Sequence, residues 1–120
     1  MSAIHLTKGG FERRVSEINK LAERWNFIGE RPAVIDFYAP WCGPCKRLSP
    51  IIDEVANEFE GKVDIYKVNV DEEQELSDLF QIRSIPTLLF IPMDGEPIRT
   101  MGAMSKAQII ENISELLGVK

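Results

Sequence analysis

Residues 34–50 read VIDFYAPWCGPCKRLSP, and they hold both cysteines of the chain, Cys42 and Cys45. The β-branched and aromatic residues at 33–38 predict a buried strand. Apolar positions then recur at helical spacing, which predicts a helix that begins near Cys42 and stops at Gly61. The cysteine pair therefore lies where a buried strand passes into a helix.

The rest of the chain alternates between strand and helix patterns. Further strands are predicted at residues 3–7, 62–70, 87–91 and 97–101. Three further helices are predicted, each with one apolar face. The first has its face at Phe11, Val15, Ile18, Ala22 and Trp25. The second follows an Asp71 N-cap and has Leu76, Leu79 and Phe80, and the third follows a Ser105–Gln108 capping box and has Ile109, Ile110, Ile113, Leu116 and Leu117. The last two strands form a hairpin around Asp94-Gly95. Together these patterns predict an α/β sandwich with a mixed sheet.

Length and composition are those of one globular domain spanning residues 1–120. The chain is 44% hydrophobic and 28% charged, and its net charge is −5 with no run of Lys and Arg, so nucleic-acid binding is not expected. No apolar run reaches the roughly 20 residues that a membrane helix needs. The start of the chain lacks a signal-peptide pattern. This favours the cytoplasm, and a mature exported (periplasmic) protein is the alternative.

The two cysteines are placed for thiol chemistry. At the start of the predicted helix, unpaired N–H groups and the helix dipole favour a thiolate at Cys42 and lower the pKa of that thiol. Cys45 lies almost one turn further along, on the same side and deeper. This arrangement suits thiol–disulfide exchange, in which Cys42 attacks a substrate disulfide and Cys45 then attacks the mixed disulfide to release the reduced substrate.

Two other uses of the cysteines fit less well. A structural zinc site needs four ligands, and the chain offers two cysteines and one distant histidine, His5, so no metal is expected. A disulfide that closes so short a loop constrains the unfolded chain little, and a chain of 120 residues forms a core without such a cross-link. His5 is interpreted as a partly exposed residue of the first strand.

Three motifs occur in the order of a known family: DFYAPWCGPCK at residues 36–46, SIPT at 84–87 and MGAMSK at 101–106. On these motifs the chain resembles the thioredoxins, from about Ile4 to Leu117. The resemblance implies the thioredoxin fold, a three-layer α/β/α sandwich in which a central five-stranded mixed sheet is flanked by four helices.

The resemblance also implies roles for individual residues. Cys42 matches the family's nucleophile and Cys45 its resolving thiol, and the two form the redox disulfide. Pro86 matches the cis-proline that faces the cysteines and offers its backbone to a peptide. The surface that binds protein substrates is matched by Trp41, Gly43, Pro44, Ser84, Ile85, Met101, Gly102 and Ala103.

Asp36 stands inside the predicted buried strand, where no exposed face is available to it, and burial raises the pKa of a carboxyl group. It matches the family's buried aspartate behind the resolving cysteine, which implies that it accepts the proton of Cys45. Lys67, on the neighbouring strand, matches a lysine that tunes this carboxylate. The alternatives are a strand-end acid that reaches solvent and, for Lys67, a solvated side chain without a catalytic part.

Residues 19–31 depart from the family pattern, because they make the first helix and its loop longer. We expect Trp25, Phe27 and Ile28 to close the bottom of the core, and a partner surface is the alternative. Tyr38 also departs, since the family often has a tryptophan at this position.

Gly-Pro between the cysteines resembles the reducing members of the family, so the expected function is a protein-disulfide reductase. Its expected partners are disulfide-containing protein substrates and a thioredoxin reductase that recharges it, because no flavin or nicotinamide site, and hence no cofactor, is visible. We expect a monomer. An exported oxidant or isomerase of the same fold is the second hypothesis, and a structural subunit without turnover is the third.

Overall fold

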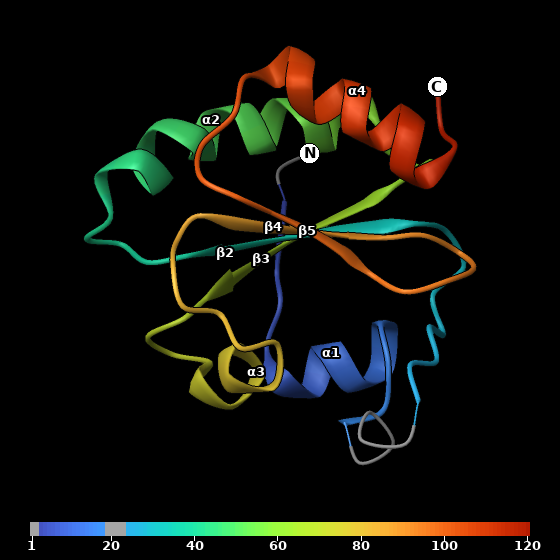
Figure 1. Ribbon diagram of the computed structural model, residues 1–120, viewed down its shortest axis with the longest axis horizontal. Coiled ribbons are helices and arrows are strands. Elements are labelled where there is room, and N and C mark those ends of the chain that lie inside the picture. The colour runs from blue at the N-terminus through green and yellow to red at the C-terminus, as the bar shows by residue number, and fades with distance from the viewer. Residues whose placement is uncertain (1–2, 19–23) are drawn as a thin grey trace.

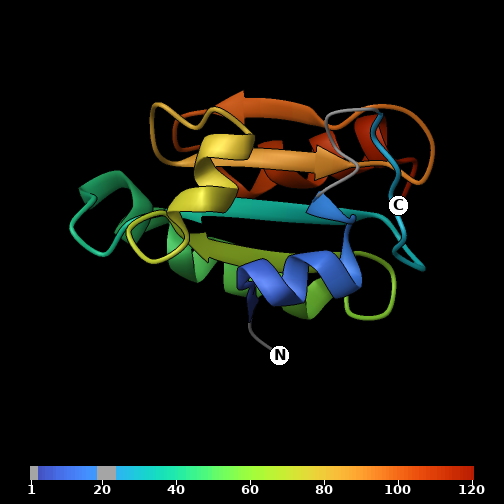
Figure 2. The same cartoon turned by 90° about the horizontal axis from the view of Figure 1, so that it is seen from below.

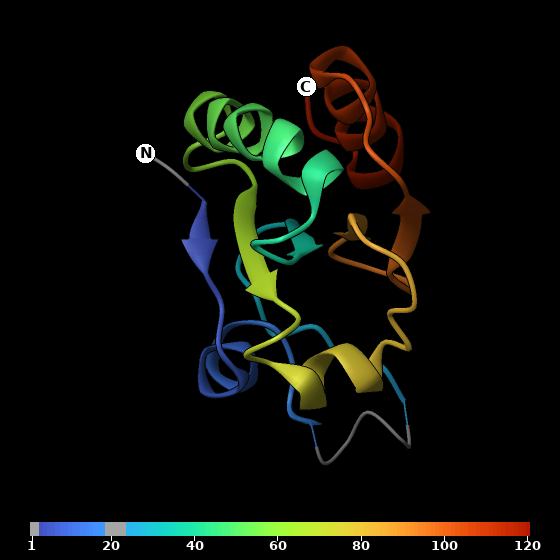
Figure 3. The ribbon, with the colours of Figure 1, turned by 90° about the vertical axis from the view of Figure 1, so that its left-hand side faces the viewer.

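In the computed structural model, which describes residues 3–18 and 24–120, five strands form one mixed sheet. The strand order is β1-β3-β2-β4-β5, which Figure 3 shows from one end of the sheet. The strands span, in that order, Ile4–His5, Asp64–Asn69, Ala33–Tyr38, Thr87–Ile91 and Ile98–Met101. β1, β3 and β2 run parallel, whereas β4 is antiparallel to β2 and to β5.

The four helices of the described residues lie in two layers, one on each face of the sheet (Figure 1). α2 (Gly43–Glu58) and α4 (Lys106–Leu117) cover one face. α1 (Lys8–Arg14) and α3 (Gln74–Leu79) cover the other, as the view in Figure 2 shows. The predicted three-layer sandwich with a mixed sheet is therefore confirmed. None of the helices in the described residues is long and apolar enough to cross a membrane.

β2 supplies side chains to a core on each face, because successive residues of a strand point to opposite sides. Val34 packs with Leu48 and Ile52 of α2. Ile35 and Phe37 pack with the residues beneath α1 and α3. The buried strand predicted at 33–38 is confirmed, since five of its six residues are buried.

The first helix is shorter than predicted. α1 ends at Arg14, because the chain turns back after one further residue and Ser16 donates its hydroxyl to the carbonyl oxygen of Asn26 at 2.7 Å. α1 therefore contains Phe11 but not Val15 or Ile18, and Trp25 lies outside any helix or strand. Ala22, also placed on that helix, lies outside the described residues.

The capping box predicted for the last helix is confirmed, and the cap predicted for the short helix is wrong. Ser105 and Gln108 exchange side-chain and backbone hydrogen bonds at the start of α4. Glu73, not Asp71, holds the N-cap position of α3, and it makes no capping hydrogen bond through its side chain. The Asp71 carboxylate instead accepts a hydrogen bond from the indole Nε1 of Trp41 at 2.9 Å.

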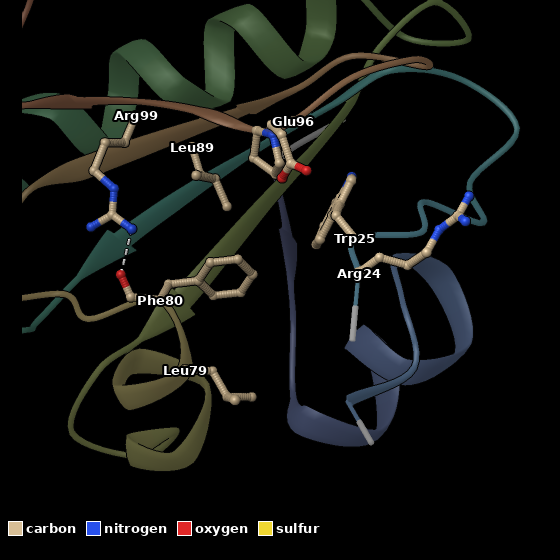
Figure 4. Close-up of a pocket in the computed structure, with 8 residues that line it drawn as sticks. Arg24, Trp25, Leu79, Phe80, Leu89, Glu96 and Arg99 are labelled. Carbon is tan, nitrogen blue, oxygen red and sulfur yellow. Dashed lines mark hydrogen bonds between the residues drawn. The ribbon is translucent and has the colours of Figure 1, made fainter. Parts of the chain in front are cut away.

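Trp25 and Phe27 pack on the face covered by α1 and α3, as expected, but the prediction for Ile28 is wrong, because its side chain is exposed. The ring centroid of Trp25 lies 6.3 Å from that of Phe80, which in turn lies 5.7 Å from Phe11 and 5.9 Å from Phe37. An open cavity of about 420 Å³ lies beside these rings (Figure 4). Across it, the guanidinium of Arg99 donates to the carbonyl oxygen of Phe80.

Candidate active site

The cysteines lie at the end of the sheet where β2 passes into α2. Cys42 is the N-cap of α2, and its sulfur accepts a hydrogen bond from the backbone N–H of Cys45 at 3.2 Å. Pro44 fits the first turn, where a backbone donor would have had no partner. The two cysteines form a disulfide with their Cα atoms 5.2 Å apart. In the reduced protein, the same N–H and the helix dipole favour a thiolate at Cys42.

The two sulfurs differ less in depth than the sequence suggested. Cys45 is the deeper, with 2% of its surface exposed, but Cys42 is only 5% exposed. Both pack with Ala39, and Tyr38 and Ile85 cover them in part. The position on the helix therefore distinguishes the cysteines more than exposure does, because only Cys42 stands at the cap.

Two loops from distant parts of the chain border the disulfide. The Ile85–Pro86 peptide bond is cis, and the carbonyl oxygen of Ile85 lies 3.9 Å from the sulfur of Cys42. The N–H of Gly102 donates to the carbonyl oxygen of Pro86 at 2.8 Å. Both loops are thereby held at the end of the sheet where α2 begins (Figure 1).

The residues matched to the substrate surface surround the disulfide with mixed exposure. Trp41 and Met101 are 69% and 70% exposed, high values for such large apolar side chains. Ile85 is half-buried and Pro86 is buried. The remaining members are exposed: Gly43, Pro44, Ser84, Gly102 and Ala103. Sequence reasoning missed Asp71, whose carboxylate fixes the Trp41 indole through the hydrogen bond described above.

Asp36 is a buried carboxyl group, with 1% of its surface exposed. Its pKa is raised to about 7, chiefly by burial; the positive charge of Lys67 opposes the rise, and the negative charge of Asp53 adds to it. One of its oxygens, Oδ1, accepts no hydrogen bond from any described residue. A carboxyl group with such a pKa can both accept and return a proton near neutral pH.

Lys67 stands beside Asp36 in the register of β3 and β2. Its ammonium nitrogen donates to the hydroxyl of Ser49 at 2.7 Å and lies 4.8 Å from the centroid of the Tyr38 ring. Sequence reasoning missed Ser49. The helical period places Ser49 on the same side of α2 as Cys45, which lies four residues before it, but does not indicate the contact with Lys67.

His5 is an exposed residue of β1, as expected. Its Nδ1 lies 3.4 Å from the hydroxyl of Tyr38. Within residues 3–18 and 24–120, no three or more His, Cys, Asp and Glu side chains are grouped where they could hold a metal ion.

A sequence model of the family described as thioredoxin matches residues 3–115. The chain belongs to the thioredoxin family. A thioredoxin of Borreliella burgdorferi is 43% identical over 116 residues, which cover 97% of this chain and 98% of the relative. A thioredoxin of Haemophilus influenzae is 49% identical over 85 residues, covering 70% and 78%. A solved structure of chloroplastic thioredoxin z, 30% identical, matches with a TM-score of 0.76 over 97% of this chain and 95% of that one.

Members of the thioredoxin family are oxidoreductases, and the redox-active pair of this chain is Cys42 and Cys45. The pair forms one disulfide, so a complete cycle transfers two electrons between the protein and a disulfide or dithiol. The reaction of the protein is therefore dithiol–disulfide exchange.

Proposed function

We propose that this protein is a protein-disulfide reductase, recharged by a thioredoxin reductase and active as a monomer in a reducing compartment such as the cytoplasm. One observation carries the proposal: the sulfur of Cys42 caps α2 and accepts the N–H of Cys45. This hydrogen bond favours a nucleophilic thiolate at neutral pH. The two neighbouring loops supply the apolar and backbone groups that a peptide substrate needs.

The proposed reduction has two steps. The thiolate of Cys42 attacks one sulfur of the substrate disulfide, forms a mixed disulfide, and displaces the other sulfur as a thiolate that takes a proton from water. Asp36 then accepts the proton of Cys45, and the resulting thiolate attacks the sulfur of Cys42 and displaces the second substrate sulfur. The substrate gains two electrons, and the cysteine pair closes as a disulfide that the partner reductase reopens.

Substrates bind in this proposal across the disulfide, between Trp41 and the loops at residues 84–86 and 101–103. The exposed side chains of Trp41 and Met101 offer apolar contacts, and the exposed backbone beside Pro86 offers hydrogen bonds to an extended peptide. Such contacts depend on the backbone of the bound peptide more than on its side chains. The substrates are therefore disulfide-containing proteins of varied sequence.

Trapping of substrates tests the two cysteine roles. Cys45→Ser should leave the first attack intact and accumulate mixed disulfides at Cys42, visible as adducts in non-reducing gels and by mass spectrometry. Cys42→Ser should form none. Adducts on Cys45 in the second variant would reverse the assignment.

The reduction potential of the Cys42–Cys45 pair tests the direction of the reaction. A value near about −270 mV, typical of thioredoxins, supports a reductase, whereas a value of about −120 to −180 mV supports the exported oxidant or isomerase. The second candidate has a specific observation in its favour, because the hydrogen bond to Cys42 also stabilises the reduced form. Equilibration with defined thiol buffers separates the two.

A further inference from the structure

Two groups from different elements meet at the Lys67 ammonium beside the active site. The Nζ atom of Lys67, on β3, donates to Ser49 on α2 at 2.7 Å. It also lies 4.8 Å from the centroid of the Tyr38 ring, at the end of β2, a distance at which a cation is attracted to an aromatic face. The ammonium is therefore held on two sides.

The carboxyl group of Asp36, beside Lys67 in the sheet, has one oxygen without a hydrogen-bond partner among the described residues. Asp36 pairs with Lys67 across β2 and β3, yet the ion pairs of the described residues do not include Asp36. Its buried Oδ1 accepts no hydrogen bond from a described residue. A buried acceptor without a partner is costly, so an unrestrained ammonium would be drawn toward it.

We propose that Ser49 is a positioning residue whose hydroxyl, together with the Tyr38 ring, holds the Lys67 ammonium off a direct ion pair with Asp36. This inference rests on the proposed role of Asp36 as proton acceptor and names the residue that regulates it. Ser49 acts on the reaction only through Lys67. It belongs to α2, which contains Cys45 and has Cys42 as its N-cap.

The chemical consequence concerns the base that Asp36 presents to Cys45. A direct ion pair stabilises the ionised carboxylate and makes it a weaker base. An ammonium held at a distance lowers the pKa of Asp36 only in part, so burial keeps this pKa near neutrality. The carboxyl group can then take the proton of Cys45 in one half of the cycle and release it in the other.

Other ionisable groups around Asp36 do not replace this control. Asp53 on α2 raises the pKa of Asp36 through its negative charge. The hydroxyl of Tyr38 points to the exposed His5 on β1, with Nδ1 at 3.4 Å. The cysteines form a disulfide in this structure and do not titrate in that state. Lys67 is the cation that lowers the pKa of Asp36, and Ser49 holds it.

The test follows the titration of Asp36 in the oxidised protein, from about pH 5 to about pH 9, by the carbon-13 chemical shift of its carboxyl group. Oxidation keeps both thiols from titrating. Ser49→Ala should lower the Asp36 midpoint by about one pH unit, the size that Coulomb's law gives when an ammonium approaches by a few ångströms at an effective dielectric constant near 20. Ser49→Thr retains a hydroxyl and should keep the parental midpoint.

A double-mutant cycle separates positioning from a general structural effect. Lys67→Met should raise the Asp36 midpoint, because it removes the opposing charge. In that background Ser49→Ala should have no further effect. An unchanged or raised midpoint in the single Ser49→Ala variant overturns the proposal, and so does a shift of equal size without Lys67.

The role of Ser49 and the proposed function can be tested separately. The titration needs neither a substrate nor turnover, so it reports on Ser49 and Lys67 alone. The role of Asp36 is tested by the rate at which Cys45 resolves a preformed mixed disulfide across the same pH range. In parental protein this rate should rise with pH around the Asp36 midpoint, and in Ser49→Ala the rise should move to lower pH by the same amount.

Discussion

The two faces of the sheet are built by different means. The face that carries the reaction is covered by α2 and α4, of 16 and 12 residues, whereas α1 and α3 on the opposite face have only 7 and 6. Cys45 and Ser49 lie on α2, and Cys42 is its N-cap. A long helix anchored by buried side chains along its length fixes the place of its first turn, where a reactive sulfur needs defined neighbours.

The opposite face has short helices, and aromatic side chains form much of its packing. Phe80, just after α3, contacts the rings of Phe11, Trp25 and Phe37. Phe11 and Phe37 are buried completely or nearly so. This contrast teaches that regular structure is concentrated where geometry matters to the chemistry, and that the other face contributes mainly to stability.

The largest expected effect concerns the reactive face and comes from Asp36→Ala. The folded protein raises the pKa of Asp36 from 3.8 to about 7. The unfolded chain therefore loses this proton first as pH rises, and the parental free energy of unfolding falls between about pH 4 and about pH 7. Across that pH window, the free energy of unfolding of the variant should rise by about 4 kcal/mol relative to that of the parent. Urea unfolding at several pH values measures this difference; a difference independent of pH would contradict the ionisation of a buried Asp36.

A matched pair of leucines sharpens the comparison of the two faces. Leu48 on α2 and Leu76 on α3 are each 1% exposed, so each Leu→Ala change should cost about 3 kcal/mol of unfolding free energy. Only Leu48→Ala should shift the reduction potential, because Leu48 anchors the helix that carries the cysteines. Chemical denaturation and thiol-buffer equilibration measure the two effects. An equal shift in Leu76→Ala would break the proposed division between the faces.

Trp25→Ala tests the aromatic packing and should have a smaller effect, about 2 kcal/mol, since the side chain is only partly buried. The rate of disulfide exchange should not change. Trp25→Phe is the control, because it keeps a ring against Phe80 and removes an indole N–H that is buried without a described partner. Thermal unfolding should place Trp25→Phe at or above the parental stability, and a loss as large as that of Trp25→Ala would show that the N–H is satisfied.

The smallest expected effect is at the start of α4. Ser105→Ala removes the hydroxyl that accepts the N–H of Gln108 at 3.1 Å, and loss of such a cap costs about 1 kcal/mol. Ser105→Asp retains an acceptor and should remain near parental stability. Denaturant midpoints compare the variants, and equal midpoints for Ser105→Ala and the parent would mean that the capping box adds nothing to the stability of this face.

Elements whose signals are local could be predicted from the sequence. The strand at 33–38 follows from its own apolar composition, and the capping box at Ser105 follows from residues three apart. The first helix was mispredicted because the helical apolar spacing continues past Arg14, where α1 ends. Its end depends on the hydrogen bond from Ser16 to Asn26, which a periodicity does not encode.

The same distinction holds within the site. The places of Cys42 and Cys45 follow from one short motif, and the burial of Asp36 follows from its strand. The contact of Ser49 with Lys67 spans 18 residues of sequence, and that of Trp41 with Asp71 spans 30. Both depend on which way a side chain points after the chain has folded, so pattern and composition could not predict them.

The two edges of the sheet also have a consequence for behaviour at high concentration. β1 has two residues and β5 has four, one of them Arg99, whose guanidinium is anchored to the carbonyl oxygen of Phe80. Short edge strands and an edge arginine give a neighbouring chain few backbone groups to extend as a further strand. The fold thereby limits fibril-like association even though it exposes large apolar side chains beside its disulfide.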